Sequence, residues 1–92
     1  MSDDKERREA LRQKLNEVHQ WPSMFMFKFV MPNLDENVES LHQIFGEEAE
    51  FRSRLSKNGN YISFTIRAMM LDADNIFDRY EKAGKIEGII SL

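Results

Sequence analysis

The chain of 92 residues contains no cysteine, and this absence removes several kinds of chemistry. Disulfides, thiolate metal sites and a cysteine nucleophile are all excluded, and a reducing compartment is compatible with the composition. No apolar run approaches the roughly twenty residues that a membrane-spanning helix needs. The charged N-terminal segment also lacks the apolar core of a secretory signal. We therefore expect a soluble, cytoplasmic protein that has no membrane partner.

An excess of positive charge is missing as well. The 13 lysines and arginines are outnumbered by 16 acidic residues, which gives a formal net charge of −3. Proteins built mainly to bind nucleic acid usually carry a basic excess, so the overall charge argues against nucleic acid as a partner. A hydrophobic content of 41%, with seven phenylalanines, is enough for one small core, and the length leaves no room for a second.

Residues 1–20 differ in composition from the rest of the chain because acidic and basic side chains make up half of them in equal numbers. Asp3 is placed to cap the start of a helix. Leu11, Leu15 and Val18 recur at helical spacing, but they form only a thin apolar stripe on a charged helix. We expect a partly frayed helical extension whose last turns dock on the domain. A helix for partner binding or self-association is the alternative.

From Pro22 onward, the hydrophobic pattern predicts a strand, a helix, a hairpin, a second helix and a final strand. The proline after Trp21 ends the N-terminal helix. The expected elements are a strand over 24–31, a helix capped by Asn33 and ended by Gly46, a hairpin with strands over 51–56 and 61–69 around Asn58-Gly59, a helix from Asp72 or Asp74 to Gly84, and a strand over 86–92.

This order of elements predicts an α+β protein with a ferredoxin-like βαββαβ fold. Such a fold is a two-layer sandwich with a four-stranded antiparallel sheet and two helices on one face. We expect it to occupy residues 21–92, after the charged helical extension at 1–20. The first strand is apolar on nearly both faces, which is typical of a central strand. The fold hosts many unrelated functions and therefore does not determine this one.

Several short motifs add a family resemblance. Trp21-Pro22 matches an aromatic–proline pair, and the segment 25–28, Phe-Met-Phe-Lys, matches an aromatic strand that ends in lysine. Residues 56–63 match a hairpin pattern of the form Ser-x-x-Gly-x-Tyr-x-Ser. From about Lys14 to Leu92, the chain resembles the YbeD-like family of small bacterial proteins, a domain of unknown function.

The resemblance implies a fold similar to the ACT-type regulatory domains of metabolic enzymes, and it implies no reaction. This chain departs from the family pattern after the first strand. Members often carry a glycine there, whereas the chain reads Val-Met-Pro-Asn at residues 30–33. In ACT domains, a glycine at this point lets the backbone approach an amino-acid ligand. Its absence argues against that mode of ligand binding.

Candidate catalytic and metal-binding side chains are few. His19 and His42 are isolated in the sequence, whereas a zinc or iron site needs three or four converging ligands. The serines of the hairpin have no histidine placed to act as a base. We therefore expect no catalytic residues, no metal and no cofactor, and a protein that is not an enzyme.

One surface remains as a candidate site. If the phenylalanines of the first strand face the helices, basic side chains of three strands project from the opposite, open face of the sheet. Four cations would then gather on one surface of an acidic protein, with hydroxyl groups among them. The predicted binding residues are Lys28, Arg52, Arg54, Arg67, Ser63 and Thr65.

Several interpretations of this open face stay open. It can be an ordinary solvated surface, on which the N-terminal helix could also lie. It can serve a regulatory or interaction module that binds a protein or a small anionic ligand. Single-stranded nucleic acid is an alternative, although an RNA-binding sheet presents stacking aromatics outward and only Tyr61 does so here. ACT-like sensing of a small molecule at a homodimer interface is the remaining alternative.

Overall fold

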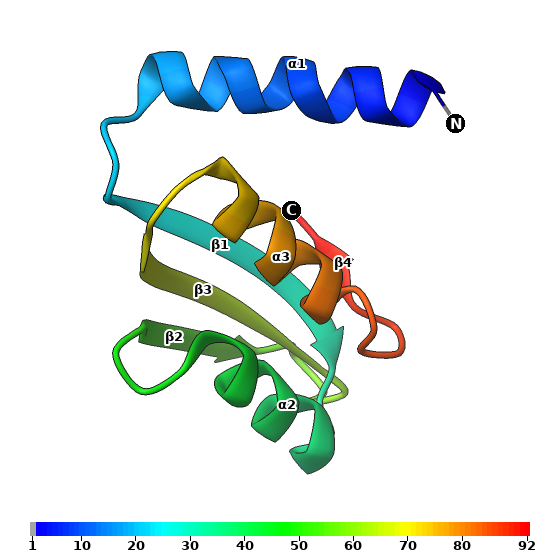
Figure 1. Cartoon of the computed structure of the whole chain (residues 1–92). Helices are drawn as coiled ribbons and strands as arrows, with labels where there is room; N and C mark the ends of the chain where they lie inside the picture. Colours follow the sequence, from blue (N-terminus) through cyan, green and yellow to red (C-terminus); the bar gives the residue numbers. More distant parts are fainter. Residues whose placement is uncertain (1) are drawn as a thin grey trace.

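The computed structural model describes residues 2–92 and confirms the α+β fold of the ferredoxin-like type. Helices α2 and α3 cover one face of a four-stranded sheet, and the opposite face carries no helix (Figure 1). The elements are α1 (Ser2–Val18), β1 (Ser23–Pro32), α2 (Asp35–Phe45), β2 (Glu50–Leu55), β3 (Tyr61–Met70), α3 (Ala73–Ala83) and β4 (Ile90–Ser91).

The sheet is antiparallel throughout, with the strand order β2-β3-β1-β4. Strands β1 and β3 lie in the middle and pair along their whole length, from Ser23 opposite Met70 to Pro32 opposite Tyr61. The central position predicted for the first strand is therefore confirmed. Strand β2 forms one edge beside β3, and the short β4 forms the other edge beside β1.

The core lies between the sheet and helices α2 and α3. Alternate side chains of β1 and β3 point into it, because successive residues of a strand face opposite sides. The ring of Phe27 packs against Phe45 of α2 and Tyr80 of α3, with centroid distances of 4.8 and 5.2 Å. The largest fully buried side chains are Phe27, Phe29, Met31, Leu41, Ile66, Met70 and Ile76.

The predicted start of α2 is wrong by one residue. Leu34, not Asn33, is the N-cap, and its side chain makes no capping hydrogen bond. The side-chain amide of Asn33 donates instead to the carbonyl of Gly59 at 3.0 Å, and its backbone N–H donates to Asn60 at 2.9 Å. The hairpin turn thus uses the polar groups of Asn33. For α3, the sequence allowed a start at Asp72 or at Asp74, and Asp72 is the N-cap, because it accepts from the N–H of Asn75 at 2.8 Å.

The final strand is much shorter than predicted. We expected it over 86–92, but only Ile90–Ser91 pairs with β1. The preceding residues form turns instead, with Ile89 donating its N–H to the carbonyl of Ile86 at 3.2 Å. Ile86 is buried in the core, and Gly88 has a φ of +80°. A Cβ at Gly88 would lie 2.9 Å from the ring of Pro32, so this turn packs tightly on the end of β1.

Helix α1 lies against α3 and not across the open face, so that alternative is wrong. Arg8 forms an ion pair with Glu81 at 3.1 Å, and Arg12 forms one with Asp74 at 2.8 Å. The guanidinium of Arg8 also lies 4.8 Å from the ring centroid of Phe77. The helix begins before Asp3, which is therefore not its cap. Of its apolar stripe, Leu15 packs on the core while Leu11 and Val18 stay exposed.

Candidate functional site: the open face of the sheet

Each of the six candidate residues lies on the open face. The strand register arranges them in rows that run across β1, β3 and β2, because residues opposite each other in an antiparallel sheet point to the same side. From one end of the face to the other, the rows are Met26, Arg67 and Glu50, then Lys28, Thr65 and Arg52, then Val30, Ser63 and Arg54. Whether these side chains bind a ligand stays a prediction.

Glu50 forms ion pairs with two of the four cations on this face. Its carboxylate lies 3.6 Å from Nε of Arg52 and 3.9 Å from Nη1 of Arg67. Lys28 and Arg54 have no carboxylate within 4.0 Å among residues 2–92. Exposed ion pairs contribute little to stability, but Glu50 reduces the positive potential around its two partners. Glu50 lies just before the predicted strand over 51–56, so strand alternation did not place it on this face.

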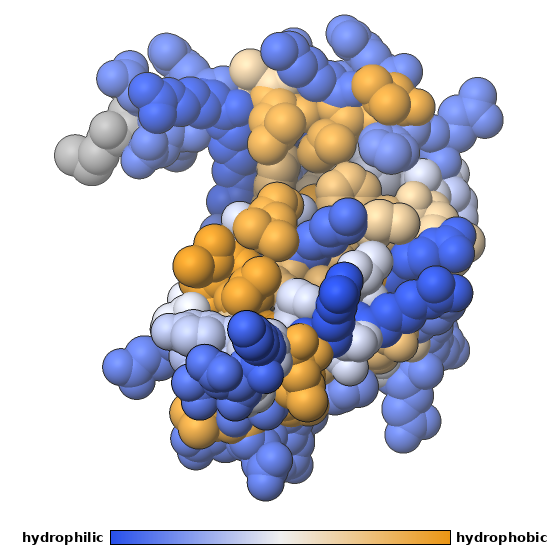
Figure 2. Space-filling model, turned by 180° about the vertical axis from the view of Figure 1, so that it is seen from behind, coloured by the Kyte–Doolittle hydropathy of each residue, from blue (hydrophilic) through white to orange (hydrophobic). Residues whose placement is uncertain are grey.

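Apolar side chains form a second component of the open face. Met24, Met26 and Met69 gather at one end, where Met24 lies opposite Met69, and their exposed fractions are 49%, 52% and 54%. Ile90 lies beside Val30 on the β4 side and is also exposed. Figure 2 shows this side of the molecule, with hydrophobic and hydrophilic surface interspersed. The strand alternation placed these methionines outward, but only the sheet register shows that they cluster.

A hollow of about 420 Å³ lies at the other end of the face, next to the hairpin turn. Strands β1, β2 and β3 and the turn all contribute to it. Two hydrogen bonds fix its polar wall: Tyr61 donates its N–H to Ser56 Oγ at 3.1 Å, and Ser63 Oγ donates to the carbonyl of Arg54 at 3.3 Å. The lining residues are Val30, Arg54, Leu55, Ser56, Lys57, Tyr61 and Ser63.

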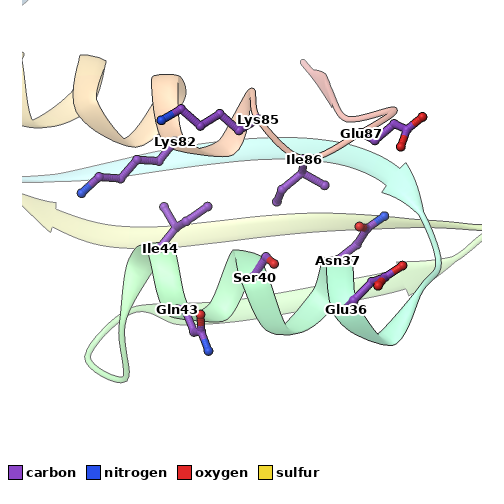
Figure 3. A pocket seen from close by; sticks show the side chains of 9 residues that line it. All are labelled: Glu36, Asn37, Ser40, Gln43, Ile44, Lys82, Lys85, Ile86 and Glu87. Carbon is purple, nitrogen blue, oxygen red and sulfur yellow. The ribbon is translucent and has the colours of Figure 1, made fainter.

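A larger groove of about 730 Å³ lies on the helical side, between α2 and the end of α3. Figure 3 shows Ile44 and Ile86 between lysines from the α3 side and Glu36 and Glu87 at the other end. Its charges are therefore mixed. One of the lysines, Lys82, is also engaged elsewhere, because it lies 3.2 Å from the Asp78 carboxylate. The hydrogen bond from Lys82 lowers the pKa of Asp78.

The two histidines, His19 and His42, contact different parts of the protein. The His42 ring packs on Phe51 with a centroid distance of 4.0 Å, and Nδ1 of His19 lies 3.1 Å from Ser23 Oγ. Within residues 2–92, no group of three histidine or acidic side chains is arranged to hold a metal ion. In the same part of the chain, no helix has the length and apolarity needed to cross a membrane.

The strand order, the two helices on one face and the exposed opposite face define a small ferredoxin-like α+β domain. The chain belongs to the family of proteins of unknown function called DUF493, whose model matches residues 16–92. YbeD-like proteins are members of this family, so the resemblance found in the sequence is confirmed. No curated protein and no solved structure matches the chain. The family match begins near the end of α1, and most of that helix lies outside it.

Proposed function

We propose that the protein is a non-enzymatic regulatory module that binds an acidic segment of a partner protein on the open face of its sheet. The single observation that carries this proposal is the clustering of exposed methionines on the same face as unpaired cations. Contiguous apolar surface on a small domain often marks a site of protein interaction. We also propose that the protein acts in the cytoplasm, which the absence of cysteine supports.

The chemistry of the face suggests the chemistry of the partner. Methionine side chains are flexible and polarizable, so they adapt to apolar partners of different shapes. Lys28 and Arg54 supply positive charge that no carboxylate within residues 2–92 neutralises at ion-pair distance. A segment that combines aspartate or glutamate with one or two apolar side chains would complement both parts, and its charges would speed the encounter.

The same face is less suited to single-stranded nucleic acid. Binding of that kind relies on aromatic side chains that stack on bases. The phenylalanines of β1 and β3 point into the core, and Glu50 would repel phosphates at the methionine end. A cross-link to nucleic acid is therefore one of the alternative results of the experiment that follows.

The test is photo-crosslinking in the native cells, with a benzophenone amino acid in place of Thr65 at the centre of the face. We expect one cross-linked protein, whose cross-linked peptide is rich in aspartate and glutamate. Arg54→Glu together with Lys28→Glu should abolish the product. The matched control carries the same amino acid in place of Gln43, an exposed residue of α2, and should not give this product.

Three outcomes would overturn the proposal: cross-links to nucleic acid, cross-links between two copies of this chain, or a partner whose cross-linked peptide is basic. A product that persists unchanged in the double charge reversal would also contradict it, because the cations would then play no part in binding.

A further inference from the structure

We propose that the hollow at the hairpin end of the open face binds a small phosphate monoester whose phosphate is carried on an apolar or aromatic group. This inference goes beyond the docking of a partner protein and shares only Arg54 with it. The hollow lies at the opposite end of the face from the methionines, and one of its two cations, Lys57, belongs to the turn and not to the sheet.

The first argument is the sign of the charge. Arg54 and Lys57 both line the hollow, and no acidic residue does. Neither cation has a carboxylate within 4.0 Å in the part of the chain that the structure describes. This distinguishes them from Arg52 and Arg67, which share Glu50. The groove between α2 and α3 differs as well, because two glutamates are among its lining residues.

The second argument is the number and kind of hydrogen-bond donors. An arginine guanidinium can bind two oxygens of a phosphate at once, and a lysine adds a compact positive charge. Ser56 Oγ accepts from the N–H of Tyr61 at 3.1 Å, so its own O–H can donate to a ligand. A phosphate monoester carries between one and two negative charges at neutral pH and has three terminal oxygens. It matches two cations and a hydroxyl better than a carboxylate does.

The third argument is the size and composition of the remaining space. The volume of about 420 Å³ is several times what a phosphate group alone would fill, and it lies in the range of small-molecule sites, roughly 300–1,000 Å³. Val30 and Tyr61 supply apolar and aromatic lining beside the cations. The ligand should therefore combine a phosphate with a flat or apolar body.

The wall that carries these groups is held by the backbone of the turn. The N–H of Ser56 donates to the carbonyl of Tyr61 at 2.9 Å, and the N–H of Gly59 donates to the carbonyl of Ser56 at the same distance. Ser56 and Lys57 therefore start from a defined backbone geometry, which lowers the ordering cost of binding.

The experiment is an amide NMR titration of the ¹⁵N-labelled full chain at constant ionic strength. The probes are phenyl phosphate, inorganic phosphate, benzoate and phenol. We expect saturable shifts for the amides of Ser56, Lys57, Tyr61 and Ser63, with phenyl phosphate binding at least fivefold tighter than inorganic phosphate or benzoate. Phenol should cause no saturable shift.

Single substitutions distinguish binding in the hollow from nonspecific attraction of anions to the basic face. Arg54→Ala and Lys57→Ala should each weaken phenyl phosphate at least tenfold. The controls are Arg52→Ala, on the same face but paired with Glu50, and Lys85→Ala, in the groove between α2 and α3; both should bind as the unchanged protein does. Each variant's spectrum also reports directly whether it is folded.

The proposal is overturned if the shifts do not saturate, if benzoate binds as tightly as phenyl phosphate, or if Arg52→Ala weakens binding as much as Arg54→Ala. The phosphate site and the docking of a partner protein can fail independently of each other. Lys57→Ala should weaken binding of phenyl phosphate and still give the product that is cross-linked through position 65. Conversely, replacing Met24 and Met69 by serine should weaken docking and leave the phenyl phosphate titration unchanged.

Discussion

Single residues of β3 alternate between positions that hold the core and positions that face solvent. Phe64 is 4% exposed and packs against Phe51 in a T-shaped arrangement, with a centroid distance of 6.3 Å. Its neighbour Thr65 points to the open face, opposite Lys28 and Arg52. Substitutions at neighbouring positions of one strand should therefore differ strongly in their effect on stability.

We predict that Phe64→Ala lowers the free energy of unfolding by about 3–5 kcal/mol, because it removes a buried ring and leaves a cavity. Arg54→Ala, on an exposed edge strand, should change it by no more than about 0.5 kcal/mol. Urea denaturation of both variants measures the two values. If Arg54→Ala unfolds the domain, Arg54 supports the core and its assignment to the exposed face is wrong.

Tyr80 should make the free energy of unfolding fall as the pH rises into the alkaline range. Burial raises the pKa of Tyr80, because it disfavours the charged phenolate in the folded state. Above about pH 10, the ordinary tyrosine pKa, the unfolded chain releases this proton before the folded one does. The contribution of Tyr80 is therefore fully present below the unfolded pKa and is lost as the pH rises through the folded pKa.

This predicts that Tyr80→Phe reduces the loss of stability between pH 8 and pH 11, measured by urea denaturation. Tyr61→Phe is the matched control, because it removes the same hydroxyl group from a side chain that is exposed on the open face, and it should leave the pH profile unchanged. Identical profiles for the two variants and the unchanged protein would show that the Tyr80 phenol is as accessible to water as that of Tyr61.

At the scale of elements, the hairpin depends on one backbone conformation. Gly59 has a φ of +75°, and apart from its two chain neighbours no residue of the described chain has an atom within 4 Å of where its Cβ would be. A side chain at this position would be disfavoured by the left-handed backbone conformation and not by a clash with other atoms. We predict that Gly59→Ala lowers the free energy of unfolding by about 1–2 kcal/mol, measured by thermal and urea unfolding.

Asn60→Ala is the control for this turn, because Asn60 contributes its backbone carbonyl to Asn33 and that group is kept. Asn60→Ala should leave the free energy of unfolding nearly unchanged. If both variants lose the same stability, the cause is a side-chain contact of the turn and not the left-handed conformation of Gly59.

The ends of elements were the least predictable part of the chain. Asp72 and Asn33 look equally suitable as helix caps in the sequence, yet only Asp72 caps a helix. The difference lies in the hairpin turn, which is remote in sequence and takes up the polar groups of Asn33. The short β4 has a similar cause. Burial of Ile86 and the tight approach of Gly88 to Pro32 turn a strand-like sequence into a bend.

At the scale of the whole molecule, α1 is joined to the domain mainly through exposed contacts. Its ion pairs to α3 lie at the surface, where such pairs contribute little. Leu15 is the residue of its apolar stripe that packs on the core. The division into an extension at 1–20 and a domain at 21–92 therefore stays a prediction that can be tested directly.

We predict that deleting residues 1–12 leaves a folded domain with a cooperative thermal transition, because the deletion keeps Leu15 and every strand. Circular dichroism and the amide NMR spectrum measure this. Loss of the cooperative transition would show that the first three turns of α1 belong to the core. The control is Arg12→Ala in the full chain, which removes the ion pairs to Asp74 and Glu9 and keeps the helix.

The order of the elements, the faces on which the residues of β1, β2 and β3 lie and the central position of β1 could all be predicted from the sequence. Period-two and helical spacing are local properties, so they can be read from neighbouring residues. For the same reason, the positions of Lys28, Arg52, Arg54 and Arg67 on one face followed from alternation and a choice of sheet order.

The differences among those cations arise from tertiary contacts. The pairing of β2 with β3 brings Glu50 opposite Arg67, and the turn brings Lys57 beside Arg54. The tertiary structure likewise decided that α1 packs on α3 and leaves the open face uncovered. These features depend on contacts between segments far apart in the chain, and no local pattern encodes the register or the docking angle that creates them.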